Sequence, residues 1–334
     1  MFAGQISKPG RIDLVDVPEP KLATPGEILF QPELGCLCGS DLPYFDGSCE
    51  WGPCPQKVGH SLHELIGVVV ETSGQCFRPG DRVLAVPVDQ MGLFQRFVVS
   101  ETRAIPLDPR RPPEHTILAQ PLGTVLFALR KLPSLSDSVV AIVGQGPIGQ
   151  IFCAALRHAG PRKIIAIDRL ASRLASSRRM GATDTVCTSD DDPIEAVRHL
   201  TDGRLADVVI EAVGHKDQAM NLCIDLLSHG GLLLYFGVPP PTLEKVRWRD
   251  LFFKNATVHT SVNPDFTRDF PLAMQWIAEG RIDLSPLVTH RYGVEQIQSA
   301  FETFRDKTDG ALKVLVDFGA GNGKSFLQSP AAHG

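Results

Sequence analysis

The stretch SVVAIVGQGPIGQIFCAALRHAG, residues 138–160, reads as an apolar strand, a glycine-rich turn and an alanine-rich helix. In such a unit Gly144 allows the tight turn, Gly146 lets the backbone approach a pyrophosphate, and Gly149 permits close packing of the helix on the strand. The helix N-terminus presents unpaired N–H groups and the positive end of its dipole to phosphate oxygens. We therefore predict the opening unit of a dinucleotide-binding sheet. The candidate cofactor residues in this stretch are Gly144, Gly146, Pro147, Ile148 and Gly149.

The next apolar strand, KIIAID, ends at Asp168. A carboxylate at the end of the second strand can accept hydrogen bonds from both ribose hydroxyls of an adenosine. It would repel a 2′-phosphate, so we expect NAD rather than NADP. Arg169 and Arg173 could offset that repulsion, which keeps NADP as an alternative.

Composition restricts the class of protein. The chain has 334 residues, which is long for one core and favours two domains. Its net charge of −5 without a basic block argues against binding to nucleic acid or to a membrane surface. No apolar run has membrane-spanning length, and the N-terminus lacks a signal-peptide core. With eight cysteines and no secretory signal, we expect reduced thiols and a cytoplasmic location.

The pattern of apolar residues changes twice along the chain. Residues 1–120 contain short alternating strands broken by glycine and proline, which indicates a β-rich, barrel-like unit. Residues 121–262 alternate apolar strands with helix-length segments, which is typical of a doubly wound parallel sheet. Residues 263–334 are mixed, and we expect them to return to the first domain. The predicted class is α/β, with the nucleotide domain inserted into the β-rich domain.

Two short stretches gather groups that can bind a metal. GCLCGSDLPYFDG, residues 35–47, contains two cysteines, and GHSLHELIGVVVE, residues 59–71, contains two histidines and two glutamates. Thiolates and imidazoles bind zinc strongly. A metal site formed from both stretches is therefore a candidate, and the alternative is that these are ordinary core and turn residues.

Seven motifs together resemble the zinc-containing medium-chain dehydrogenases, the alcohol and sorbitol dehydrogenase group. They are CGSD, HELIGVV, PGDRV, QPLGTVLFAL, VGQGPIGQ, DVVIEAVG and GALKVLV, and they cover roughly residues 5 to 318 in the order of that family. The resemblance implies a β-rich, GroES-like catalytic domain and a Rossmann domain. It also implies a hydride transfer between NAD and an alcohol or polyol substrate in the cleft between them.

The resemblance assigns roles near the metal. Cys38 matches the zinc-ligating cysteine, Ser40 the proton relay on the alcohol side, and Asp41 the supporting carboxylate. His63 with Glu64 matches the histidine–glutamate pair of the family. His60 offers a competing alignment, and Leu62 stands where a glycine normally precedes the histidine; we expect His63, because Glu64 and the following strand then align.

The third anionic ligand departs from the family, because Gln120 stands where relatives often carry a cysteine, aspartate or glutamate. A neutral amide is a poor zinc ligand. Glu64 as a ligand would balance the charge left after Cys38 and His63, as in a sorbitol dehydrogenase type of site. Gln120 would then be an outer hydrogen-bonding partner or a helix-capping residue.

Two features of the family are missing. No cysteine-rich segment follows PGDRV, so we expect one catalytic zinc and no structural zinc. Pro43 replaces a histidine that relatives use to pass the proton to solvent, so Tyr44, water or Glu64 would have to serve instead.

The resemblance also places further cofactor contacts. Thr124, Phe236, Gly237 and Val238 would line the nicotinamide, and Lys313 would reach the cofactor phosphates. Residues 256–262, ATVHTSV, would form a strand near the edge of the nucleotide sheet, and we expect a homodimer or homotetramer. Three alternatives remain: an NADP-dependent aldehyde or ketone reductase, a zinc-free quinone or enoyl reductase, and a cofactor-binding structural protein.

Overall fold

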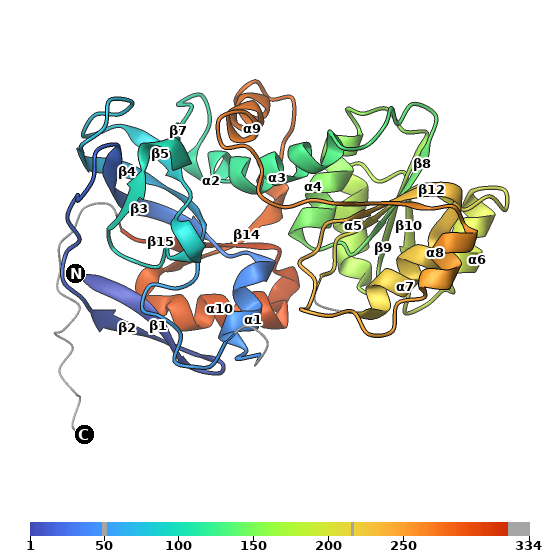
Figure 1. Cartoon of the computed structure of the whole chain (residues 1–334), viewed down its shortest axis with the longest axis horizontal. Coiled ribbons are helices and arrows are strands. Elements are labelled where there is room, and N and C mark those ends of the chain that lie inside the picture. The colour runs from blue at the N-terminus through green and yellow to red at the C-terminus, as the bar shows by residue number, and fades with distance from the viewer. Residues whose placement is uncertain (49–51, 215–216, 320–334) are drawn as a thin grey trace. The chain divides into compact units, whose positions relative to one another are not determined.

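The computed structural model describes residues 1–48, 52–214 and 217–319. The chain divides into two compact units. We call Met1–Ile117 with Val288–Gly334 the terminal unit, and Leu118–Leu287 the central unit. In Figure 1 the blue beginning and the red end of the chain belong to the terminal unit. The central unit therefore lies, in sequence, between the two segments of the terminal unit.

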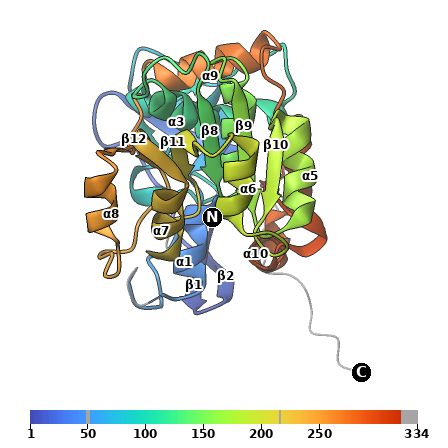
Figure 2. The same ribbon diagram turned by 90° about the vertical axis from the view of Figure 1, so that its right-hand side faces the viewer.

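The central unit contains a parallel sheet whose strand order is β10-β9-β8-β11-β12-β13. Successive strands run outward from β8 in one direction and from β11 in the other, so the order reverses between these two strands. Figure 2 looks onto this unit, with β12, β11, β8, β9 and β10 labelled from left to right. The strands are β8 (Val139–Val143), β9 (Lys163–Asp168), β10 (Asp184–Cys187), β11 (Ala206–Glu211), β12 (Leu227–Tyr235) and β13 (Thr257–Thr260).

The strands β8, β9 and β11 are apolar because both faces of the sheet are covered by helices. Every residue of β8 is buried. The helices are α3 (Ala119–Leu129), α4 (Pro147–Leu156), α5 (Ala171–Met180), α6 (Pro193–Leu200), α7 (Asp217–Leu226), α8 (Trp248–Phe253) and α9 (Asp269–Ala278). The predicted doubly wound sheet is thus confirmed.

The second boundary between the units differs from the sequence prediction. We expected the chain to return to the β-rich domain at residue 263, but the central unit continues to Leu287. The reason is the packing of α9 on α3. A Cβ atom at Gly123 would lie 2.3 Å from the Phe270 ring, so the two helices approach closely there. A guanidinium nitrogen of Arg130 also lies 2.9 Å from the buried Asp269 carboxylate.

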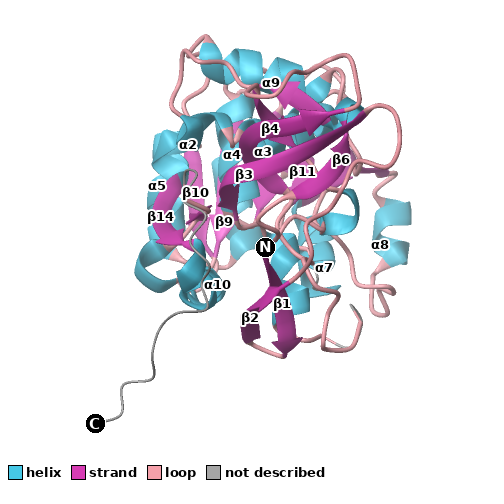
Figure 3. Cartoon of the chain, turned by 90° about the vertical axis from the view of Figure 1, so that its left-hand side faces the viewer, coloured by secondary structure: helices cyan, strands magenta, loops and turns pink. Residues whose placement is uncertain are grey.

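The terminal unit is β-rich, as predicted. Its main sheet has the order β14-β15-β3-β4-β5-β7, with β6 paired to β3, and β1 and β2 form a separate two-stranded sheet (Figure 3). The strands are β1 (Phe2–Lys8), β2 (Arg11–Asp16), β3 (Glu27–Cys36), β4 (Glu64–Thr72), β5 (Arg82–Ala85), β6 (Phe97–Ser100), β7 (Ala104–Pro106), β14 (Val288–Gly293) and β15 (Lys313–Asp317). Its helices are α1 (Leu42–Phe45), α2 (Pro113–Thr116) and α10 (Ile297–Asp306).

The last strand of the chain completes the sheet of the terminal unit. β15 pairs antiparallel with β3, and Leu315 lies opposite Cys36. β3 in turn pairs with β4, where Cys36 lies opposite Glu64. This register brings the start of β15 beside the two stretches that carry the candidate metal ligands. No helix among the described residues is long and apolar enough to cross a membrane.

Candidate active site

The two stretches predicted to bind a metal meet in the terminal unit. Cys38 follows β3, and His63 and Glu64 lie at the start of β4. One donor atom from each of Cys38, His63 and Glu64 lies within 4.8 Å of the others, and no other such group occurs in the described ranges. Donors that share one zinc ion lie roughly 3 to 4 Å apart. The spacing is therefore close to that of a zinc shell.

An unsatisfied ring nitrogen supports the fit to a metal. His63 Nδ1 is buried and has no hydrogen-bond partner among the residues that the structure describes. A buried nitrogen without a partner is costly, and coordination of a cation would satisfy it. His60, the competing candidate, is absent from the cluster that contains Cys38. The donor set of one thiol, one imidazole and one carboxylate suits zinc.

Asp41 ties the two metal-binding stretches together. Its Oδ2 accepts a hydrogen bond of 2.8 Å from the Cys38 amide. Its Oδ1 accepts bonds of 2.8 Å from the Ser61 hydroxyl and 3.1 Å from the Leu62 amide. The carboxylate is fully buried, so these bonds form away from competing water. Asp41 therefore fixes Cys38 relative to the segment that precedes His63.

The backbone before His63 explains how a leucine can replace the glycine of the family. Ser61 and Leu62 have φ values of +103° and +63°, in the left-handed region that favours glycine. Each such residue costs about 1–3 kcal/mol, and the conformation persists only where its surroundings hold it. Asp41 supplies two of the bonds that hold this segment, and the Leu62 side chain is completely buried. The backbone that leads into His63 is thus held by Asp41 and by the buried Leu62 side chain.

Glu64 belongs to the metal cluster, but its carboxylate is paired with a lysine. Lys313, the first residue of β15, places Nζ 2.5 Å from Oε1 and 2.6 Å from Oε2 of Glu64, and it also bonds to the Leu37 carbonyl. We predicted that Lys313 would reach the cofactor phosphates; instead it is 1% exposed and its ammonium is committed to Glu64. The difference arises because β15 pairs with β3, beside the metal-binding residues.

The charges around this pair act in opposite directions. Burial raises the pKa of Glu64 to about 7, although the Lys313 ammonium lowers it. Burial lowers the pKa of Lys313, but the neighbouring Cys36 and Glu64 outweigh this, so the net pKa is raised. We predicted that Glu64 would neutralise the metal. The ammonium of Lys313 competes with a metal for that role.

Ser40 and Tyr44 were predicted to handle the substrate proton. The Ser40 Oγ atom is buried and has no hydrogen-bond partner among the described residues, so it can bond to a ligand. The Tyr44 ring lies 4.2 Å from the His60 ring, measured between centroids. Burial raises the pKa of Tyr44 and lowers the pKa of His60. Glu64, the third group considered for the proton path, is closed off from solvent.

The glycine-rich turn of the central unit has the predicted geometry. Gly144 has a φ value of +95°, which suits the tight turn. A Cβ atom at Gly149 would lie 2.0 Å from the Gly144 carbonyl oxygen, so helix α4 packs closely on the turn. A Cβ atom at Gly146 would meet nothing within 4 Å, which leaves the backbone open to a ligand. Pro147 occupies the first turn of α4, where its missing N–H costs nothing, and Ile148 follows it.

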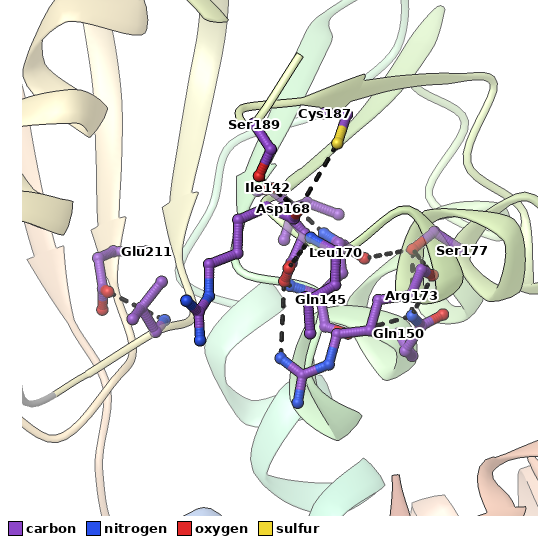
Figure 4. A network of polar contacts seen from close by, with 12 residues as sticks. Ile142, Gln145, Gln150, Asp168, Leu170, Arg173, Ser177, Cys187, Ser189 and Glu211 are labelled. Atoms are coloured by element: carbon purple, nitrogen blue, oxygen red, sulfur yellow. Dashed lines mark hydrogen bonds and ion pairs between the residues drawn. The ribbon is translucent and has the colours of Figure 1, made fainter. Parts of the chain in front are cut away.

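A buried network that sequence reasoning missed supports this turn (Figure 4). Gln145 donates from Nε2 to the Ile142 carbonyl at 3.1 Å, and its Oε1 accepts from the Ser177 hydroxyl at 2.9 Å. Gln150 donates to the Gln145 carbonyl at 3.2 Å and to the Arg173 carbonyl at 2.9 Å. The network joins the turn to α5. Two glutamines in an apolar stretch were the available signal, because buried amides must find partners.

Asp168 lies at the end of β9, beside the turn. Its Oδ2 accepts a hydrogen bond of 2.7 Å from the backbone N–H of Gln145. Its Oδ1 accepts one of 2.9 Å from the backbone N–H of Leu170. Arg173 approaches to 3.7 Å, and Figure 4 shows its guanidinium on the same side as the carboxylate. Arg169 is exposed. The structure therefore places Arg173 beside Asp168, and Arg169 follows Asp168 directly in the sequence.

The other predicted cofactor residues also lie in the central unit. Thr124 on α3 donates its hydroxyl to the Pro121 carbonyl at 2.7 Å. Phe236, Gly237 and Val238 follow β12, at the same carboxyl edge as the glycine turn, and Val238 is 41% exposed. Gln120 is buried on α3. It belongs to the central unit, whereas the metal cluster belongs to the terminal unit.

Known proteins that are similar to this chain are dehydrogenases. A family model described as zinc-binding dehydrogenase matches residues 147–279. The L-threonine 3-dehydrogenase of Bacillus velezensis is 26% identical in an alignment that covers 90% of this chain and 94% of that protein. The structure of an alcohol dehydrogenase from Thermus sp. ATN1 has a TM-score of 0.82 at 25% identity, covering 95% of this chain and 99% of that one. A putative zinc-binding dehydrogenase from Sinorhizobium meliloti, bound to NADP, has a TM-score of 0.79 at 25% identity, covering 95% and 98%.

Residues 147–279 match the zinc-binding dehydrogenases, and the relatives and solved structures resemble the chain over most of its length. The predicted resemblance to the zinc-containing medium-chain dehydrogenases is thereby confirmed, and this dehydrogenase is an oxidoreductase. In the chain, the β-rich terminal unit is interrupted by the central unit with its parallel sheet.

Proposed function

We propose that this dehydrogenase uses one zinc ion and NAD to oxidise the hydroxyl group of an alcohol or polyol, or to reduce the corresponding carbonyl. The cluster of Cys38, His63 and Glu64 carries the proposal, because it combines typical zinc donors within 4.8 Å. The match of residues 147–279 to the zinc-binding dehydrogenases and the likeness to L-threonine 3-dehydrogenases support the same reaction.

We assign the metal to Cys38 and His63, with Glu64 as the third protein donor once it exchanges Lys313 for the metal. Asp41 holds Cys38 and the backbone before His63 in place. Gln120 is a neutral hydrogen-bonding group in this assignment. Since no cysteine-rich lobe follows residue 82 of the sequence, we propose one zinc per chain.

When bound, zinc supplies a Lewis acid that lowers the pKa of an alcohol hydroxyl, and NAD supplies the acceptor for a hydride. The protein contributes position and proton transfer. Ser40 Oγ, which is buried without a partner among the described residues, takes up the hydroxyl proton and passes it on. Tyr44, packed on His60, continues the path toward solvent.

The cofactor assignment rests on the central unit. The pyrophosphate binds over the turn from Gly144 to Gly149 and the N-terminus of α4, and the adenosine ribose binds at Asp168. Thr124, Phe236, Gly237 and Val238 contact the nicotinamide. NADP is the second candidate, because Arg169 and Arg173 lie beside Asp168 and a relative from Sinorhizobium meliloti was solved with NADP.

The test is elemental analysis of the purified protein, followed by NADH formation with a panel of secondary alcohols, polyols and L-threonine. We include L-threonine because curated relatives are L-threonine 3-dehydrogenases. One zinc per chain with NAD-dependent turnover is the expected result. Turnover without zinc would favour a quinone or enoyl reductase, and zinc without turnover on the whole panel would favour a cofactor-binding structural protein.

We also propose that the protein is a cytoplasmic homodimer or homotetramer. The described cysteines are free thiols, which suits a reducing compartment. β13 lies at the edge of its sheet, as the sequence predicted, and its Val258 is 37% exposed. Exposed strand edges are commonly covered in native proteins.

A further inference from the structure

Glu211, the last residue of β11, is a fully buried carboxylate to which the preceding assignments give no role. Its Oε1 accepts hydrogen bonds of 2.9 Å from both the Val213 and the Gly214 amides. Its Oε2 accepts a bond of 3.2 Å from the Gly237 amide. One carboxylate therefore binds the backbone of two separate loops, residues 212–214 after β11 and residues 236–238 after β12.

The two loops approach each other without intervening side chains. A Cβ atom at Gly237 would lie 2.3 Å from the Gly214 nitrogen and 2.5 Å from Oε2 of Glu211. Gly214 has a φ value of +66°, which favours glycine in the turn. The carbonyl oxygen of Glu211 accepts bonds of 3.1 Å from the Phe236 and Gly237 amides as well. Glu211 is thus the common attachment point of both loops.

The same loops adjoin the glycine turn. A Cβ atom at Gly144 would lie 2.8 Å from the Val213 side chain and 3.0 Å from the Ala212 backbone. All three loops follow the carboxyl ends of neighbouring strands, β8, β11 and β12, where open parallel sheets bind their ligands. Val213 and Val238, one on each loop, stay 40% and 41% exposed. An exposed apolar residue on each loop at this edge suits contact with a flat ring.

A carboxylate suits this position better than a neutral side chain. Burial raises the pKa of Glu211, and the amides of Gly214, Val213 and Gly237 lower it again by bonding to the charged form. Both oxygens can only accept, which matches three N–H donors. A glutamine would turn an NH₂ group toward at least one of these donors.

We propose that Glu211 is a positioning residue for the nicotinamide half of the cofactor, holding the loops 212–214 and 236–238 in their binding conformation. This inference rests on the proposed function, since it assumes that a nicotinamide dinucleotide occupies the edge of the sheet. Glu211 acts through the backbone of both loops. It fixes where Val213, Gly237 and Val238 lie before the cofactor arrives, so that binding orders little further structure.

The experiment compares E211Q with D269N in the zinc-loaded, full-length protein, with NADH binding measured by fluorescence titration. Asp269 is a matched control, because it is also a fully buried carboxylate of the central unit, but it pairs with Arg130 between α3 and α9. We expect E211Q to weaken NADH binding by about tenfold or more, the effect of one lost charged hydrogen bond. D269N should leave NADH binding unchanged even where it lowers the thermal midpoint.

Two further measurements separate positioning from general stability. The KM for NAD should rise in E211Q while the zinc content stays at the wild-type value. E211D, which keeps the charge on a shorter side chain, should bind NADH with intermediate affinity, and it replaces E211Q if that variant does not fold. Wild-type NADH affinity in folded E211Q and E211D, or equal losses in E211Q and D269N, would overturn the inference. A wild-type protein that binds neither NADH nor NADPH would overturn the proposed function itself.

Discussion

The Nζ atom of Lys313 lies 2.6 Å from Oε2 of Glu64, and the two side chains are only 1% and 0% exposed. Both groups of a buried ion pair lose their hydration. Their mutual attraction offsets this cost only while both partners are present. Glu64 is also one of the three clustered metal donors. The lysine and a zinc ion therefore compete for the same carboxylate.

Replacing Lys313 by methionine tests this competition. The Lys313→Met variant should lower the unfolding free energy of the metal-free protein by about 3–5 kcal/mol, because it leaves a buried carboxylate uncompensated. Added zinc should stabilise the variant more than the wild type, since Glu64 is then available to the metal. Urea unfolding with and without zinc measures both effects.

The control for this variant is Arg82→Met. Arg82 binds Glu33 at 2.5 Å, but its side chain is 46% exposed. Solvent screening reduces the contribution of such a pair to about 0–1 kcal/mol, so this variant should change stability little and zinc binding not at all. Equal zinc stabilisation in Lys313→Met and wild type would argue that Glu64 does not bind the metal.

Glu64→Gln and Gln120→Ala distinguish the two candidates for the third metal-binding group. Glu64→Gln should lose zinc affinity and turnover, because it removes an anionic donor and leaves the Lys313 ammonium buried without a counter-charge. Gln120→Ala should keep zinc and alter mainly rate or substrate range. Elemental analysis after dialysis gives the metal content. Zinc retained in Glu64→Gln but lost in Gln120→Ala would reverse the assignment.

The sequence predicted the sheet and the glycine turn because these depend on local patterns, whereas the grouping of Cys38, His63 and Glu64 was expected from the family resemblance. Strand and helix lengths follow the apolar spacing, and Gly144 and Gly149 sit where their conformations are needed. The predicted domain boundary at residue 263 was wrong, because the central unit continues to Leu287. The apolar pattern of α9 in the sequence shows that one face of the helix is buried, but it does not show which unit buries that face.

The partners of Lys313 and Glu211 could not be predicted in the same way. Lys313 and Glu64 are separated by 249 positions, and only the pairing of β15 with β3 brings them together. Glu211 ends an apolar strand, and its sequence context does not reveal that two loops will donate to it. Leu62 departs from the family at this position in the sequence. Its left-handed conformation can be seen only in the backbone of the structure.

Acidification should expose the contribution of His60 to stability. Burial lowers the pKa of His60 below its ordinary value of 6.5, partly offset by Asp41 and Asp89 and reinforced by Lys57. Below pH 6.5 the unfolded chain then binds a proton more readily than the folded protein, so stability is lost as the pH falls. His60→Phe keeps a ring against Tyr44 and removes this titration.

Thermal midpoints of wild type and His60→Phe, measured above and below pH 6.5, check the effect. The wild type should lose more stability on acidification than the variant. The exposed His199, replaced by glutamine, serves as the control and should follow the wild-type pH dependence. A steeper loss in His60→Phe than in the wild type would show that His60 favours folding in its charged form.

Asp168→Ala tests the choice of cofactor. The variant removes a carboxylate that we place on the adenosine ribose and that also accepts from the Gln145 amide at 2.7 Å. NAD binding should weaken by about tenfold, the cost of a charged hydrogen bond. NADP binding should weaken less, because Arg173 and Arg169 remain. The difference between the affinities for NAD and NADP should therefore become smaller.

The control is Asp184→Ala. Asp184 also lies in a strand of this sheet, but at the start of β10, where its carboxylate is 3.3 Å from Lys163 Nζ. It should leave the affinities for both cofactors unchanged. A wild-type protein that already prefers NADP by a wide margin would contradict the assignment of Asp168.

The surface around β13 leads to the last prediction, on assembly. Trp248, Phe252 and Phe253 of α8 are 63%, 75% and 62% exposed, and Val262, just after β13, is 72% exposed. Exposed large apolar side chains and an unpaired strand edge are each typical of a protein–protein contact. If two copies pair through this surface, Phe252→Glu with Val258→Lys should dissociate them, because a charge on each of two contact sites would lose its water.

Light scattering at micromolar concentration should show a dimer or tetramer for the wild type and a monomer for the double variant. Circular dichroism should show unchanged secondary structure, since neither side chain is buried within its own chain. A wild-type monomer would refute the assembly, whereas an unchanged oligomer in the double variant would place the contact elsewhere on the chain.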